Sequence, residues 1–82
     1  MKLERVGEQY VTVEVGKTKV LIWKDSPVAF ISNGIGYTDE YWNSHSYKPL
    51  GEWIDSFLAG VERHVLTCQV FDLNIKNLGG NS

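Results

Sequence analysis

The N-terminal half of the chain carries the alternation of apolar and polar residues that is typical of β-strands. Residues 10–15 place valine at every second position, with polar or aromatic side chains between, which predicts a half-buried strand. Residues 18–23 are apolar on both faces, which favours a central strand. Gly16 and Lys17 stand between these segments and offer a tight turn, so we expect an antiparallel hairpin.

A second hairpin is expected within residues 28–38. Its centre is Asn33-Gly34, a pair that tolerates the two positive φ angles of a type I′ turn. The apolar segments on either side of this turn predict two further paired strands. Pro27 fixes its own φ and pushes Ser26 towards an extended conformation, so a turn is expected to precede them.

An amphipathic helix is expected over residues 48–59. Pro49 suits its first turn, where no backbone donor is lost, and Gly60 suits its C-terminal end. The apolar positions recur with the spacing i, i+3, i+4, i+7 and i+8 of one helix face, and they are Leu50, Trp53, Ile54, Phe57 and Leu58.

The pattern after this helix favours strand again. Residues 65–71 are rich in β-forming residues, and Phe71, Leu73 and Ile75 alternate with polar residues. One long strand or two short ones over residues 65–76 would fit this pattern.

These elements predict an α+β fold. We expect an antiparallel β-sheet of four to five strands with one amphipathic helix packed on a face, in the order β-β-β-β-α-β. Residues 1–78 are expected to form a single domain, and residues 79–82 a flexible C-terminal tail.

The charge of the chain narrows the function only slightly. Eight Lys and Arg stand against ten Asp and Glu, and each half of the chain carries a net charge of −1. No basic stripe exists, which disfavours nucleic acid as a partner. No N-terminal apolar run and no segment of ~20 apolar residues is present, so we expect a cytoplasmic protein with no membrane contact.

Catalytic and metal-binding chemistry finds little support in the sequence. Cys68 is the one cysteine, and in phase with Leu66 and Val70 it is expected to point inward rather than to act as a nucleophile. His64 and Cys68 would stand ~13 Å apart on a strand, too far to share a metal ion. We therefore expect no enzyme activity, no cofactor and no metal.

The connector over residues 39–47 combines aromatic and adaptable polar residues, the composition of binding hot spots. Tyr41 and Trp42 could instead complete the core of a small protein. The candidate binding residues in and beside this connector, with the acidic residues of the exposed helix face, are Tyr37, Tyr41, Trp42, Asn43, His45, Tyr47, Glu52 and Asp55.

Three segments between residues 20 and 58 carry a family resemblance. They are Ser26-Pro27-Val28-Ala29-Phe30 of an expected strand, Tyr41-Trp42-Asn43-Ser44 of the connector, and Trp53-Ile54-Asp55-Ser56-Phe57-Leu58 of the expected helix. In these segments the chain resembles a small domain of uncharacterised tailed-phage accessory proteins. The connector departs from the Thr-Thr-Ser-Lys-His run of that family. The resemblance implies a phage protein that binds and redirects or blocks a host protein in the bacterial cytoplasm. The family carries no catalytic residues over to this chain.

The leading hypothesis is a non-enzymatic protein-binding accessory protein, for example a phage-encoded inhibitor or modulator of a host protein such as a defence protein. Two alternatives stay open. One is a nucleic-acid-binding module that uses the same aromatic residues. The other is a structural homo-oligomer, for example a homodimer in which an edge strand pairs across a two-fold axis.

Overall fold

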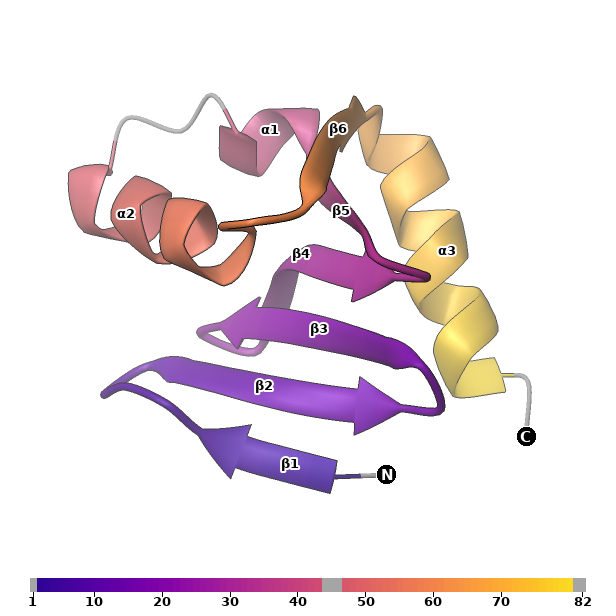
Figure 1. Ribbon diagram of the computed structural model, residues 1–82, viewed down its shortest axis with the longest axis horizontal. Coiled ribbons are helices and arrows are strands. Elements are labelled where there is room, and N and C mark those ends of the chain that lie inside the picture. Colours follow the sequence, from indigo (N-terminus) through magenta and orange to yellow (C-terminus); the bar gives the residue numbers. More distant parts are fainter. Residues whose placement is uncertain (1, 44–46, 81–82) are drawn as a thin grey trace.

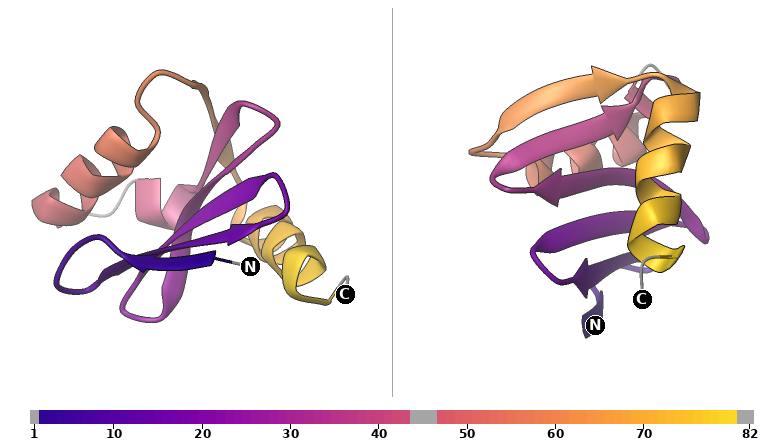
Figure 2. Two further views of the ribbon diagram at one scale, coloured as in Figure 1. Left: turned by 60° about the horizontal axis from the view of Figure 1, so that its bottom comes forward. Right: turned by 90° about the vertical axis from the view of Figure 1, so that its right-hand side faces the viewer.

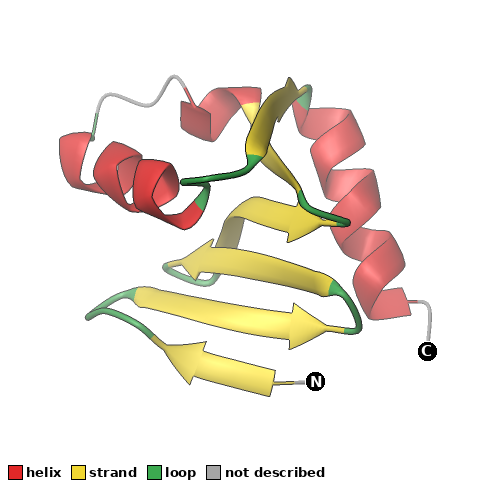
Figure 3. Cartoon of the chain, viewed as in Figure 1, coloured by secondary structure: helices red, strands yellow, loops and turns green. Residues whose placement is uncertain are grey.

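Six strands of the described residues form one open sheet, and their order in space follows their order along the chain (Figure 1). The computed structural model describes residues 2–43 and 47–80. The elements are β1 (Lys2–Arg5), β2 (Tyr10–Val15), β3 (Thr18–Trp23), β4 (Ser26–Ser32), β5 (Ile35–Asp39), α1 (Glu40–Asn43), α2 (Lys48–Phe57), β6 (Glu62–Leu66) and α3 (Cys68–Gly80). Figure 3 separates helices from strands by colour, and the expected α+β class is confirmed.

The first five strands form an antiparallel meander joined by tight turns. Asn33 and Gly34 have φ angles of 54° and 79°, so the expected hairpin forms with positive φ at both central residues. The turn between β3 and β4 also has two positive φ angles, 49° at Lys24 and 64° at Asp25. This backbone conformation is uncommon for residues other than glycine, and it lies directly after Trp23.

The last strand, β6, runs parallel to β5 and is reached through a crossover that contains α1 and α2. The expected sheet was antiparallel throughout, and β6 is the exception. Helix α2 confirms the helix expected from the apolar spacing and covers one face of the sheet. Leu50 and Ile54 are fully buried there, in one cluster with Leu21 and Val28 of the strands.

Helix α3 covers the opposite face, so the sheet is the middle layer of three (Figure 2). Phe71 is fully buried in a cluster with Val20 and Phe30, and the centroids of the two phenyl rings are 5.3 Å apart. Ile75, one helical turn later, packs against the same cluster. These two residues attach α3 to the sheet.

The strand expected over residues 65–76 is wrong beyond Leu66, because a helix begins at Cys68. The carbonyl of Thr67 accepts the N–H of Phe71 at 2.9 Å, and its hydroxyl accepts the N–H of Val70 at 3.4 Å. Thr67 therefore acts as an N-terminal cap. Burial of Phe71 on the sheet outweighs the β propensity of the segment.

Three further elements differ from the expectation. Helix α1 lies within the segment expected as a connector, residues 39–47, so the fold has more than the one expected helix. Strand β1 was not expected, because its four residues show no apolar alternation; all four are exposed. Helix α3 continues to Gly80, so the tail expected at residues 79–82 begins within a helix, and residues 81–82 lie outside the described residues. Among the described helices, none is long and apolar enough to cross a membrane.

Candidate binding surface

Trp23, the last residue of β3, is the centre of an aromatic cluster. Its ring centroid lies 5.7 Å from that of Trp42, which is edge-on, and 5.5 Å from that of Tyr47, which is stacked. Tyr10 is the partner of Trp23 on β2, with a centroid distance of 6.4 Å. Trp23 is only 9% exposed. It therefore serves as a buried platform for rings that come from distant parts of the chain.

The outer part of this cluster is exposed. Tyr41 is 55% exposed and stands edge-on to Trp42, with centroids 4.8 Å apart, and Tyr47 is 45% exposed. The Lys24 ammonium lies 4.9 Å from the centroid of Trp23, within the range of a cation–π interaction. We call Trp23, Lys24, Tyr41, Trp42 and Tyr47 the aromatic surface.

Local backbone features place these side chains. Asp39, at the end of β5, accepts the N–H of Tyr41 with Oδ1 at 3.0 Å and so turns the chain into α1. Trp42 then packs against the cluster under α2, while Tyr41 stays exposed. Tyr47 is the residue that precedes α2, so its position depends on where that helix starts.

Tyr10 lies buried beneath the aromatic surface, and this position affects the pKa of its phenol. Its ring stacks on Trp53 of α2, with centroids 4.3 Å apart. Burial raises the pKa of its phenol, and the nearby Tyr47 raises it further. Tyr10 therefore stays neutral at physiological pH and serves as packing rather than as an acid or base.

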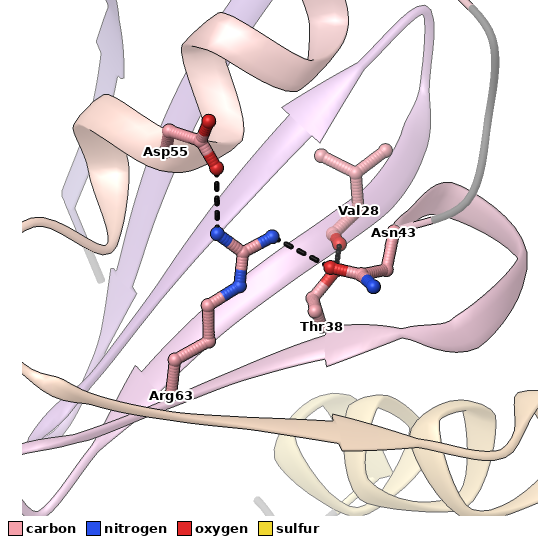
Figure 4. A network of polar contacts seen from close by, with 5 residues as sticks. All are labelled: Val28, Thr38, Asn43, Asp55 and Arg63. Atoms are coloured by element: carbon pink, nitrogen blue, oxygen red, sulfur yellow. Dashed lines mark hydrogen bonds and ion pairs between the residues drawn. The ribbon is translucent and has the colours of Figure 1, made fainter.

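Asn43 and Asp55 form a polar network with Arg63 of β6 (Figure 4). The Arg63 guanidinium donates from Nη1 to Asp55 Oδ1 and from Nη2 to Asn43 Oδ1, both at 2.6 Å. The network ties β6 to α2 and α1, and its Asn43 directly follows Trp42 of the aromatic surface. Below it, the buried Thr38 hydroxyl donates to the Val28 carbonyl at 3.1 Å and joins β5 to β4 (Figure 4).

The other sequence-based candidates do not share this surface. Tyr37 lies on the opposite face of the sheet, stacked on Phe30 with centroids 4.9 Å apart and beside His64 at 5.9 Å. Glu52 is exposed on α2 and borders a shallow groove with Pro49. His45 lies outside the described residues. The structure thus groups Tyr41, Trp42 and Tyr47 around Trp23, and it joins Asn43 and Asp55 through Arg63.

Cys68 differs from the buried strand residue that the pattern predicts. It is half-buried at the start of α3, and its thiol donates to Asp39 Oδ1 at 3.0 Å. This hydrogen bond raises the pKa of the Cys68 thiol, and desolvation and the Asp39 charge add to it. The thiol form is therefore favoured, which is the opposite of what activates a nucleophilic cysteine.

Metal ligands are equally sparse in the described part of the chain. No three His, Cys, Asp or Glu side chains gather there in a way that could hold a metal ion. The Cys68 and Asp39 pair has no third ligand beside it among these residues.

Sequence reasoning missed three contributors to the surface and its border, namely Trp23, Lys24 and Arg63. A signal for Trp23 existed, because a hairpin centred on Gly16-Lys17 places residue 10 opposite residue 23. Arg63 carried no such signal, because its partners lie 8 and 20 residues away in the sequence.

Comparison with protein families, with characterised proteins and with solved structures finds no match to this chain.

Proposed function

We propose that this chain is a non-enzymatic binding protein that contacts a protein partner through the aromatic surface. The observation that carries the proposal is a pair of exposed tyrosines held by buried or half-buried rings: Tyr47 stacks on Trp23, and Tyr41 stands edge-on to Trp42. Tyrosine and tryptophan are the residues that most often dominate protein–protein interfaces. A tyrosine already held by its neighbours also loses little conformational freedom on binding.

The polar border supports the same function. Arg63 binds both Asn43 and Asp55, and Asn43 directly follows Trp42 in α1, so this charged and polar network begins next to the aromatic surface. An apolar centre with a polar rim is the usual composition of a binding patch. The resemblance of residues 20–58 to phage accessory proteins suggests a bacterial host protein as the partner and the host cytoplasm as the location.

The test is an affinity capture with matched variants. The wild-type chain, a Tyr41→Ala/Tyr47→Ala variant and a Val70→Ala/Leu73→Ala control are immobilised and exposed to host lysate. Val70 and Leu73 are also exposed apolar residues, but they lie on α3, away from the aromatic surface. Trp42 is left unchanged because it packs against the core.

The expected result is one stoichiometric protein retained by the wild type and by the control. The tyrosine variant should bind that protein about tenfold more weakly or worse, as hot-spot truncations do. Equal retention by all three chains would contradict the proposed surface. Nucleic acid retained at low salt, and lost from the tyrosine variant alone, would replace the protein partner with a nucleic-acid partner.

A further inference from the structure

Strand β1 is an exposed edge of the sheet. All four of its residues are exposed, and Leu3 is 66% exposed. In the views of Figures 1 and 2, no described element lies beyond β1 on the side away from β2. An open edge of this kind can pair with another strand.

The backbone of β1 has hydrogen-bonding groups directed to that edge. The N–H of Val6, just after β1, donates to the Tyr10 carbonyl at 3.0 Å, so it points towards β2. In an antiparallel pair, successive residues direct their own N–H and C=O groups to opposite sides of the strand. The N–H and C=O groups of Leu3 and Arg5 therefore point away from β2, towards the position that a further strand would occupy.

The residues of β1 are complementary to themselves in one antiparallel register. With a two-fold axis at Leu3, Lys2 faces the partner's Glu4 and Glu4 faces the partner's Lys2, while Leu3 faces the partner's Leu3. A register centred on Glu4 would instead oppose two glutamates. Opposite charges on paired strands stabilise the pair, and like charges destabilise it.

The neighbouring strands extend this complementarity. Lys2 is the cross-strand partner of Glu14, and Glu14 is the partner of Lys19 on β3. The signs of the charges alternate along this row, and the partner's Glu4 would continue the alternation. On the other face of the sheet, Leu3 is the cross-strand partner of Val13, so two copies of Leu3 would extend an apolar row.

Strand β6, at the other edge of the sheet, does not have complementary charges of this kind. In β6, a register centred on His64 would oppose Arg63 and the partner's Val65, with no pair of opposite charges. Arg63 is also held by Asp55 and Asn43. β1 is therefore the edge suited to self-association.

We propose that this chain forms a two-fold symmetric dimer in which β1 pairs antiparallel with β1 of a second copy, in the register centred on Leu3. The two sheets then become one continuous sheet. The aromatic surface takes no residue from β1, so both copies keep that surface available. Because the paired strands are short, their interface is smaller than the ~800 Å² per partner of a standard complex, and the dimer should be weak.

Sedimentation equilibrium tests the dimer on a chain that carries no N-terminal tag. We expect a monomer–dimer equilibrium between roughly 10 µM and 1 mM, the range of a weak complex. A mass that stays monomeric at the upper concentration would overturn the proposal. So would an open-ended series of larger species, because a two-fold contact closes on itself.

A charge-swap cycle tests the register. Lys2→Glu and Glu4→Lys each oppose two pairs of like charges, so each should weaken the dimer by about tenfold. The combined Lys2→Glu/Glu4→Lys chain restores opposite charges across the contact between the copies and should regain part of the dimer, because its glutamate at position 2 still faces Glu14 of β2. Lys17→Glu, the same charge change in the exposed β2–β3 turn, is the control and should leave the dimer unchanged. Far-UV circular dichroism checks that each variant is folded.

Two results would contradict this register. One is a dimer that neither single swap weakens. The other is a combined variant that dimerises no better than the single ones.

Discussion

The loop after α2 packs so closely against β5 that there is no room for a side chain at Gly36. At Gly36 in β5, an added Cβ would lie 2.7 Å from Leu58 Cδ2 and 3.0 Å from Val61 Cγ2. Gly36→Ala should therefore lower the free energy of unfolding by about 1–3 kcal/mol, as overpacking does. Urea denaturation followed by tryptophan fluorescence measures this change.

Gly51 provides the control for that prediction. It lies within α2, and an added Cβ would meet nothing within 4 Å. Gly51→Ala should raise the free energy of unfolding by about 0.5–1 kcal/mol, because alanine favours the helix more than glycine does. If the two substitutions shifted stability equally, crowding at Gly36 would not be the cause.

The thiol of Cys68 should react slowly. Its hydrogen bond to Asp39 raises its pKa, so the reactive thiolate forms only at higher pH than in a free cysteine. In the wild type, the rate of alkylation by iodoacetamide should increase only at a higher pH than it does for a free cysteine. In Asp39→Asn the negative charge is gone, so the pKa falls and the profile should move to lower pH.

Asp25→Asn removes the same charge from the exposed β3–β4 turn and should leave the alkylation profile of Cys68 in place. An Asp39→Asn profile that coincided with the wild type would show that Asp39 does not set the reactivity of Cys68.

At the scale of elements, α3 shows where sequence reasoning reaches its limit. Phe71 and Ile75 lie four residues apart, which fits one face of a helix and, with Leu73 between, also the alternation of a strand. Local pattern could not separate these two readings. The buried contact of Phe71 with Phe30 of β4 decides between them, and it joins residues that are far apart in the sequence.

The cap of α3 gives a test at this scale. Thr67→Ala removes the hydroxyl that accepts the Val70 N–H and should lower the free energy of unfolding by about 1 kcal/mol. Thr67→Ser keeps the hydroxyl and should stay within a few tenths of a kcal/mol of the wild type. Thermal unfolding followed by circular dichroism compares the three chains. Equal losses in both variants would argue against the cap.

The hairpins of the meander could be predicted because their turns are local. The parallel pairing of β5 with β6 could not, because it depends on a long crossover that carries no register signal. In the binding surface too, contacts between neighbours in the sequence could be predicted and contacts between distant residues could not. Tyr41, Trp42 and Tyr47 are neighbours in the sequence and were grouped from it, whereas Trp23 reaches them only through the folded sheet.

Across the whole molecule, the protection of backbone amides against hydrogen exchange should decrease from the centre of the sheet to its β1 edge. β3 and β4 are paired on both sides and carry buried residues from both clusters, whereas β1 is exposed throughout. Amide hydrogen exchange at low protein concentration should be slowest in β3 and β4 and fastest in β1. Exchange in β1 as slow as in β3 would contradict this gradient.

The order of the elements along the chain has a consequence for synthesis. Among the described residues, the first five strands precede α2 and α3, which supply the covers of the two faces of the sheet. A chain growing from its N-terminus therefore presents Leu21 on one face and Phe30 on the other before Leu50 and Phe71 have left the ribosome. Such uncovered sheets aggregate readily. The nascent chain should therefore depend on chaperones until its last helix has left the ribosome.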